Sequence, residues 1–393
     1  MLIRYRKNAQ GLDAVAKVYG SDENGIDIGK IDANAVSVIR KLTEAGYESY
    51  IVGGAVRDLI LGRTPKDFDI ATAASPRQVH KLFRNSRIIG RRFRLVHITF
   101  GPKIIEVSTF RSIRDHEAAD DNQFGTIEED CTRRDFTINS LYYDPLKGNL
   151  IDFNNALEDF KKKRLVSLIP LGKTFIEDPV RMVRAVKYSV TTGFRIPYKL
   201  SHAIRVYAPE LSGISTSRMT EEVNKILACG MSSAVFRRLH DYKLLVYMLP
   251  AISVYASYPQ LFESLGKLDE KVAQGKDSSQ PVSKAEMYLG LARPFLAVNA
   301  ELHDPMMLFY DFLRQIKVLI SPITPSNYDL ETASAQYMSE QGMKVPRGAV
   351  KHRNPDLPQP RPQHPQHGTK PGEKPAGKRH RKHHTKKKPQ DQA

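Results

Sequence analysis

The sequence has few of the residues that are typical of secreted proteins, of proteins with structural metal sites or of membrane proteins. Of its 393 residues only two are cysteines, Cys131 and Cys229, and none is tryptophan. Two cysteines cannot build a disulfide framework, and these two do not have metal-ligand spacing. No apolar run approaches the roughly 20 residues that a membrane-spanning helix needs, and no apolar run follows the basic N-terminus. We therefore expect a cytoplasmic protein with no signal peptide and no membrane partner.

Acidic residues are also in deficit. Lys and Arg together number 60 against 43 Asp and Glu, which gives a net charge of +17. A surplus of this size indicates a polyanionic partner, either nucleic acid or an anionic membrane surface. The membrane surface is the weaker interpretation, because the most basic segment lacks the apolar face that a surface anchor needs.

That basic segment is the C-terminal tail. Residues 346–393 carry 13 Lys and Arg, three acidic residues and nine of the 24 prolines, with almost no large apolar side chains. Such a composition cannot bury enough surface to offset its ordering entropy, so we predict a disordered tail. The run from Lys378 to Lys388 is typical of an arm that binds RNA phosphates without sequence preference; a solvated tail with no specific role is the alternative.

Hydrophobic periodicity predicts a mixed α/β region followed by a helical one. Helical and strand patterns alternate up to about residue 150, and after Asp178-Pro179 every pattern is helical. The fold class is therefore α+β. The predicted divisions are a loose N-terminal extension 1–31, a mixed head 32–170, a helical neck 171–250, a helical body 251–345 and the disordered basic tail 346–393.

The strongest local motif is Lys66-Asp67-Phe68-Asp69, at the start of a predicted strand. Side chains at i and i+2 of a strand share a face, so Asp67 and Asp69 are expected side by side. Two carboxylates that close are unfavourable unless a cation neutralises them, as Mg²⁺ does at a phosphoryl-transfer site. Alone, the Asp-x-Asp pattern is weak evidence, because most instances are solvated turns.

A glycine pair strengthens this interpretation. Gly53 and Gly54 lie between a predicted strand and a predicted helix, where backbone N–H groups can approach a phosphate, and Arg57 can bind phosphate through its guanidinium group. The alternative is a tight turn with Arg57 and Asp58 paired on the surface. A third acid, Glu106, stands in an otherwise apolar strand pattern and could complete a two-metal site or could face solvent on an edge strand.

Two further clusters combine arginines with carboxylates. Arg133 and Arg134 are candidates for phosphate binding, and the nearby Asp135 carboxylate could bind ribose hydroxyls or support a metal. In the second cluster Asp178 is expected to cap a helix that starts with Pro179. Its neighbours at i+3 spacing on the same face could present donors and an acceptor to a base edge; they are Arg181 and Arg184. Arg218 and Glu222 are interpreted as a structural helix pair.

In this order the motifs resemble those of the class II template-independent nucleotidyltransferases, which comprise the tRNA CCA-adding enzymes and the bacterial poly(A) polymerases. The resemblance covers roughly residues 34–250, and the segment Ile89 to Phe100 is similar to the poly(A) polymerase branch. It implies a polymerase-β-like nucleotidyltransferase head followed by all-α neck and body domains. By position it implies that Asp67 and Asp69 are catalytic metal ligands, that Glu106 or Asp135 is the third catalytic carboxylate, and that Asp178 and Arg181 face the incoming base.

The function implied is transfer of AMP from ATP to the 3′-hydroxyl of RNA, with release of pyrophosphate and Mg²⁺ as cofactor. The expected nucleotide-binding residues are Gly53, Gly54, Arg57, Arg133, Arg134, Asn139, Asp178, Arg181 and Arg184. A CCA-adding enzyme is the first alternative. A non-catalytic RNA-binding protein is the second, although the intact set of carboxylates argues against it.

Overall fold

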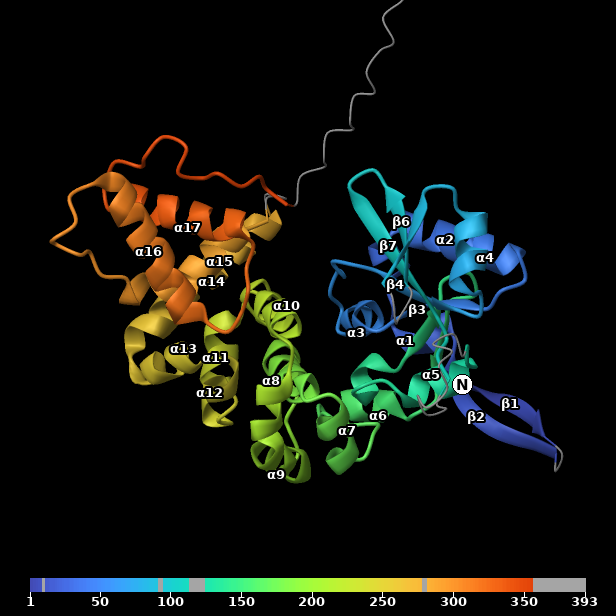
Figure 1. Ribbon diagram of the computed structural model, residues 1–393. Helices are drawn as coiled ribbons and strands as arrows, with labels where there is room; N and C mark the ends of the chain where they lie inside the picture. The colour runs from blue at the N-terminus through green and yellow to red at the C-terminus, as the bar shows by residue number, and fades with distance from the viewer. Residues whose placement is uncertain (9–10, 91–94, 113–123, 278–280, 356–393) are drawn as a thin grey trace, which may run out of the picture. The chain divides into compact units, whose positions relative to one another are not determined.

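The computed structural model describes residues 1–8, 11–90, 95–112, 124–277 and 281–355 (Figure 1). Residues Met1–Arg353 form one compact unit. Nine strands of the described residues make one sheet in the order β1-β2-β9-β8-β3-β4-β7-β6-β5. Their bounds are β1 Leu2–Asn8, β2 Gly11–Tyr19, β3 Ser49–Val52, β4 Asp69–Thr72, β5 Ser86–Ile89, β6 Leu95–Phe100, β7 Lys103–Thr109, β8 Tyr142–Asp144 and β9 Asn149–Asp152.

Helices pack against both faces of this sheet. One face contacts α2 (Ala33–Glu44) and α4 (Pro76–Leu82), and α3 (Gly54–Ile60) packs beside them (Figure 1). The sequence dictates α2 locally, because Asp32 accepts the backbone N–H of Asn34 at its start and apolar side chains recur at helical spacing. On the other face a smaller core includes residues of α5 (Ile127–Thr132).

The parallel pairing of β4 with β7 positions the acidic residues. In this register Asp69 lies opposite Glu106. Because strand side chains alternate between faces, the buried neighbours Ile70 and Val107 point into the core shared with α2, and both acids point to the opposite face. Two acids separated by 37 positions in the sequence are thereby brought together at one end of the sheet.

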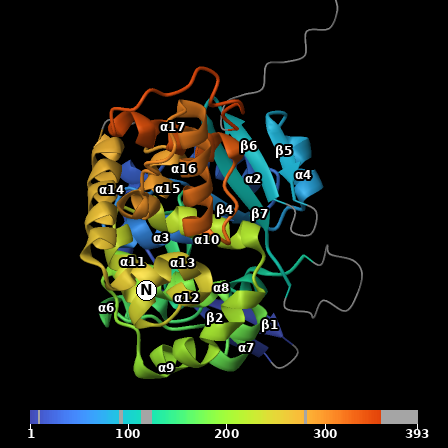
Figure 2. The same cartoon turned by 60° about the vertical axis from the view of Figure 1, so that its left-hand side comes forward.

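The chain after β9 is helical. Figure 2 shows α14 to α17 gathered in one bundle, and contacts between successive members confirm that they pack together. The α-helices are α6 Ala156–Lys161, α7 Leu171–Glu177, α8 Val180–Thr192, α9 Tyr198–Tyr207, α10 Thr216–Leu227, α11 Ser232–Asp241, α12 Leu245–Met248, α13 Pro250–Val254, α14 Pro259–Asp277, α15 Lys284–Ala292, α16 Pro305–Ile320 and α17 Asn327–Glu340; a four-residue α1, Ser21–Asn24, precedes the head. Short 3-10 turns occupy Ile28–Lys30, η2 Thr137–Asn139, Ala208–Gly213, Tyr255–Ser257 and Arg293–Phe295.

The predicted fold class is confirmed: a mixed sheet with helices comes first, and helical segments follow. None of the helices in the described ranges is long and apolar enough to span a bilayer. The head, neck and body boundaries at residues 170 and 250 stay predictions, since both fall inside one compact unit.

The N-terminal residues differ from the prediction of a loose extension. Strands β1 and β2 form a hairpin, and β2 joins the main sheet by pairing with β9 through contacts such as Val18 with Ile151. Among the hairpin residues whose burial is described, Ala16 is the only buried apolar residue. The alternation of apolar and polar residues in β2 is weak, because small and partly exposed residues occupy its inward positions. Pairing with β9, more than 130 residues away, is therefore what makes this segment a strand.

The tail prediction also needs a correction at its start. Ala349 is buried, and the Glu331 carboxylate on α17 accepts the backbone N–H groups of Lys351 and His352 at 2.8 and 3.0 Å. The segment up to Arg353 is therefore part of the compact unit, because these backbone donors find a buried acceptor. Residues 356–393, which include the predicted phosphate-binding arm, lie outside the described residues.

Candidate active site

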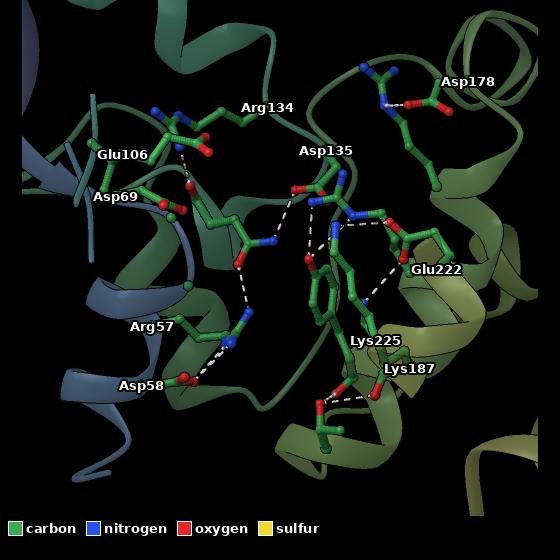
Figure 3. A pocket seen from close by; sticks show the side chains of 18 of the residues that line it. Arg57, Asp58, Asp69, Glu106, Arg134, Asp135, Asp178, Lys187, Glu222 and Lys225 are labelled. Carbon is green, nitrogen blue, oxygen red and sulfur yellow. Dashed lines mark hydrogen bonds and ion pairs between the residues drawn. The ribbon is translucent and has the colours of Figure 1, made fainter. Parts of the chain in front are cut away.

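A cavity of about 2050 Å³ contains almost all of the predicted site residues (Figure 3). Its walls come from the head sheet and from helices α7, α8 and α10. The predicted residues that line it are Gly53, Gly54, Arg57, Asp69, Glu106, Arg133, Arg134, Asp135, Asn139, Asp178, Arg181 and Arg184. Twelve Lys and Arg side chains line it against eight Asp and Glu, so the cavity suits an anionic ligand.

Asp67 is the predicted site residue that does not line the cavity. Strand β4 begins at Asp69, and Asp67 lies in the bend before it. The two carboxylates therefore do not share a strand face as the i, i+2 spacing predicted. Asp67 is still close enough for its negative charge to act on Asp69.

Asp69 and Glu106 form an electrostatically strained pair. Asp69 keeps exposed surface toward the cavity, yet protein atoms surround most of its carboxylate. This burial, together with the charges of Glu106 and Asp67, raises the pKa of Asp69 to about 6. The ionised form of Asp69 is unfavourable because two other carboxylates are close. A bound divalent cation would relieve this repulsion.

These acids therefore fit a metal, although they do not form a complete cage by themselves. Within the ranges that the structure describes, no three His, Cys, Asp or Glu side chains are arranged to hold a metal ion. Mg²⁺ is commonly held by one or two carboxylates, with water and substrate phosphates as its other ligands. Asp69 and Glu106 meet that requirement, with Asp67 adjacent.

Gly53 makes the turn that opens the space beside Asp69. Its φ of 69° and ψ of −131° belong to a region that is almost exclusive to glycine. A Cβ atom there would lie 3.7 Å from Nη1 of Arg134 and 4.0 Å from Oδ2 of Asp69. The glycine therefore carries the chain from β3 into α3 while leaving this part of the cavity open.

Arg134 is committed to the protein rather than to a ligand. Its Nη2 lies 3.0 Å from Oδ2 of Asp130, its Nε donates to the Tyr142 hydroxyl at 3.2 Å, and its Nη1 donates to the Asn139 carbonyl oxygen at 3.3 Å. Tyr142 in turn donates to Asp130 at 2.7 Å. The guanidinium group is thereby a structural part of the cavity wall, which differs from the phosphate-binding role that the sequence suggested.

Arg133 is the arginine of this pair with spare donors. It lines the cavity, and its side chain has no hydrogen-bond or ion-pair partner among the described residues. Burial and the positive charge of Arg111 lower its pKa from the ordinary value, and Arg181 acts in the same direction. Cations held this close together are stabilised by a bound anion.

A chain of polar contacts runs from the head to helix α8 (Figure 3). Arg57 Nη1 donates to Asn139 Oδ1 at 3.0 Å, and Asn139 Nδ2 donates to Asp135 Oδ1 at 3.0 Å. The other oxygen of Asp135 lies 2.9 Å from Nη2 of Arg184, which donates to the Tyr188 hydroxyl at 3.1 Å. Tyr188 also lies beneath Arg57, with the guanidinium carbon 5.1 Å from the ring centroid. These five side chains link the head to helix α8 in one geometry. Arg57 also pairs with Asp58, as the alternative interpretation of the turn predicted, with Nε and Nη2 at 3.0 and 2.9 Å from Asp58 Oδ1.

Two carboxylate oxygens in this region are buried without an aligned hydrogen bond, Asp135 Oδ2 and Asp178 Oδ1. Asp135 Oδ2 is close to Arg184, but the angle is unsuitable for a hydrogen bond, so the ion pair leaves its acceptor capacity unused. Buried acceptors of this kind normally have a donor. Both residues line the cavity, so donors from a ligand could satisfy them.

Asp178 does not cap the following helix as predicted. Helix α8 begins at Val180 after Pro179, and no side chain caps it. The second oxygen of Asp178 instead accepts from Arg218 Nη2 at 2.8 Å and lies 3.8 Å from Arg181 Nε. The backbone of Asp178 ends the preceding helix α7.

Arg218 and Glu222 are not the structural pair that their spacing suggested. Arg218 holds Asp178, while Glu222 is buried and contacts Lys187 Nζ at 3.2 Å and Lys225 Nζ at 3.6 Å (Figure 3). Burial works against the ionised form of Glu222, but the two lysines hold its pKa below the ordinary value. This cluster lines the cavity.

The sequence reasoning missed Lys187, Tyr188 and Lys225. Lys187 is buried between apolar residues of α8, and its charge at a core position was the available signal. Tyr188 gave no signal, because an aromatic residue at helical spacing normally indicates packing. Lys225 resembles any helix-surface lysine until α8 and α10 are placed together.

Family models match two parts of the chain. One described as "Poly A polymerase head domain" matches residues 49–166, and one described as "Probable RNA and SrmB- binding site of polymerase A" matches residues 193–255. The first contains the carboxylate strands, and the second begins directly after helix α8.

Curated relatives carry two names. Poly(A) polymerase I of Escherichia coli O6:H1 is 41% identical over 269 residues, which is 64% of this chain and 58% of that protein. The CCA-adding enzyme of Geobacillus kaustophilus is 36% identical over 218 residues, or 54% of each chain. The chain therefore spans less than three fifths of the length of these relatives.

Solved structures share the fold. The Bacillus stearothermophilus CCA-adding enzyme in complex with CTP aligns with a TM-score of 0.51 and 26% identity, covering 79% of this chain and 83% of that one. A tRNA nucleotidyltransferase complexed with a primer tRNA and an incoming ATP analog aligns with a TM-score of 0.54 and 24% identity, covering 77% and 84%.

Proposed function

We propose that the chain belongs to the family of poly(A) polymerases and tRNA nucleotidyltransferases, and that it adds AMP from ATP to the 3′ end of RNA without a template. The observation that carries the proposal is the Asp69–Glu106 pair inside a cavity whose other walls are rich in arginine and lysine. In this cavity, carboxylates suited to a metal ion lie near arginine and lysine side chains suited to polyphosphate.

The reaction proposed is attack of the RNA 3′-hydroxyl on the α-phosphate of ATP. A phosphodiester bond forms, the bond between the α- and β-phosphates breaks, and pyrophosphate leaves. Asp69 and Glu106, with Asp67 adjacent, would hold Mg²⁺, which in such sites lowers the pKa of the attacking hydroxyl and neutralises the leaving group.

The remaining residues bind and orient the substrates. Arg57 and Arg133 would bind the triphosphate, since one is fixed by Asn139 and Tyr188 and the other has free donors. Asp135, whose Oδ2 lacks an aligned donor, could accept from a ribose hydroxyl.

Asp178 and Arg181 supply an acceptor and donors for an adenine edge. Asp178 Oδ1 is buried and unsatisfied, and Arg218 fixes the other oxygen of the same carboxylate. When one base forms hydrogen bonds with all the buried polar groups of a site, a different base leaves some of those groups without a partner. The site therefore discriminates strongly against the second base. Protein side chains, rather than a template strand, would therefore select the nucleotide.

Addition of A rather than CCA is favoured by the relatives. Identity to Poly(A) polymerase I is higher and extends over more of this chain than identity to the CCA-adding enzyme. The basic run from Lys378 to Lys388 would add sequence-independent affinity for RNA.

An extension assay tests the proposal. The protein is incubated with Mg²⁺, a 5′-labelled unstructured RNA and each nucleoside triphosphate separately. We expect a long ladder with ATP alone. Extension limited to a few nucleotides, requiring CTP and a tRNA acceptor, would assign the CCA-adding reaction instead. Binding of the RNA without extension under any condition would leave only an RNA-binding protein.

The free guanidinium of Arg133 predicts a separate kinetic effect. Arg133→Ala removes a donor to the triphosphate without breaking any side-chain hydrogen bond or ion pair among the described residues. We therefore expect the KM for ATP to rise about tenfold, the equivalent of roughly 1.4 kcal/mol of charge-assisted hydrogen bonding, with an unchanged melting temperature. The matched control is Arg77→Ala, an exposed arginine on α4 outside the cavity. An unchanged KM would remove Arg133 from the ATP site.

A further inference from the structure

A histidine on strand β6 faces the proposed metal ligand Glu106. His97 is paired with Glu106 in the antiparallel register of β6 and β7, and its Nε2 lies 3.3 Å from Glu106 Oε2. We infer that His97 is a positioning residue that fixes the orientation of the Glu106 carboxylate beside Asp69. The inference rests on the proposed function in assigning a cation to these two acids.

The direction of the hydrogen bond follows from the partner. An ionised carboxylate can only accept, so Nε2 of His97 carries the hydrogen and donates it to Oε2. No other hydrogen-bond or ion-pair partner of Glu106 is found among the described residues. One oxygen is thereby restrained, and the other stays available to a cation. Such outer contacts are the usual way in which proteins orient carboxylate ligands.

The strand places His97 on this face without ambiguity. Its neighbours Val96 and Ile98 are fully buried on the opposite face of the sheet. Because strand side chains alternate, His97 must point to the face that carries Glu106 and Asp69. A change of register by one residue would bury the imidazole, so the core packing of β6 fixes the contact.

Glu106 lies between His97 on β6 and Asp69 on β4. The charge of Glu106 contributes to the raised pKa of Asp69, so the two acids repel each other when no cation is present. Without His97, the Glu106 side chain would be free to rotate into the open cavity. The hydrogen bond from His97 keeps one carboxylate oxygen on the β6 side, so the carboxylate is already oriented when a cation arrives.

An incidental surface pair is the competing interpretation, since the two side chains are 30% and 40% exposed. Exposed pairs of this kind often contribute nothing measurable. The two interpretations differ in what happens to cation binding when His97 is replaced, and in whether that effect depends on Glu106.

The test measures binding of Mn²⁺ to the full chain by electron paramagnetic resonance, without RNA or nucleotide. We expect His97→Leu to weaken binding about tenfold, the lower end of the range for outer contacts of metal ligands. His97→Gln, whose amide nitrogen can donate from a similar position, should restore binding to within about twofold of the unmodified protein. His80→Leu is the control, because His80 also makes one exposed hydrogen bond, to Ser86 on β5, but lies outside the cavity.

A double-substitution cycle decides the mechanism. In a Glu106→Gln background His97→Leu should have no further effect on Mn²⁺ binding, because its target is gone. Binding of the His97→Leu protein equal to that of the unmodified protein, or an equal loss in both backgrounds, overturns the inference. Since no RNA or nucleotide is present, the result does not depend on which nucleotide the protein adds; a protein that binds Mn²⁺ through this pair but extends no RNA would refute the proposed function alone.

Discussion

Asp69→Asn is expected to reduce the rate of nucleotide addition by more than about 100-fold, beyond the 10–100-fold that loss of an outer contact to a metal ligand typically costs. The amide keeps the size of the side chain but cannot supply the negative charge that the cation requires. Single-turnover RNA extension at saturating ATP measures the change. Asp22→Asn on α1, an exposed acid outside the cavity, is the matched control.

Stability separates this loss from unfolding. The folded protein binds a proton at Asp69 up to a pKa of about 6, whereas the unfolded chain releases it at the ordinary, lower value. Its ionisation therefore lowers the free energy of unfolding as pH rises through that interval. Without metal at neutral pH, the Asn variant should melt no lower than the unmodified protein. An inactive variant that melts much lower would leave the catalytic role of Asp69 unsupported, and full activity in the variant would refute it.

Arg134→Leu is expected to have the largest effect on stability, a loss of about 3 kcal/mol in the free energy of unfolding. The substitution removes three donated hydrogen bonds and leaves Asp130 buried beside Tyr142 without its cation. Arg134→Lys should recover little, because one ammonium cannot reach the three acceptors that the planar guanidinium reaches. Thermal and urea unfolding measure both variants, with Arg77→Leu as the control.

The pH dependence identifies Asp130 as the cause. Burial alone would raise the pKa of Asp130, but the charge of Arg134 and the hydrogen bond from Tyr142 hold it below the ordinary value. In the unmodified protein, the lowered pKa of Asp130 stabilises the fold at any pH above the pKa of an aspartate in the unfolded chain. This stabilisation is lost as pH falls through the pKa of Asp130 in the folded protein. Without Arg134 the pKa rises, so the stability gap between the two proteins should narrow on acidification. A gap that is the same at pH 7 and near pH 4 would exclude this explanation.

Where pattern and fold agree, the determinants are local. Helices α2 and α8 follow from the local pattern, because buried side chains at i, i+3 and i+4 define each face and a glycine follows the last turn. These helices depend on residues within one or two turns of each other.

Several of the predictions that the structure corrects involve distant partners. The β1–β2 hairpin is a poor strand by composition and is stabilised by β9. Asp178 was assigned to a helix cap from the neighbouring proline, but Arg218, 40 residues on, is its hydrogen-bond partner. Asp67 was assigned to a strand that begins two residues later.

The sequence by itself determined the residue types available to this protein: acids suited to a cation, arginines suited to phosphate, a glycine turn and an order of motifs that resembles a nucleotidyltransferase family. Only the tertiary structure decided which of these groups meet. It placed Glu106 opposite Asp69, committed Arg134 to Asp130 while leaving Arg133 free, and set His97 behind Glu106. The reason is that residue type and short-range periodicity are written in neighbouring positions, whereas strand register and helix packing depend on the burial of the whole core, which no local pattern contains.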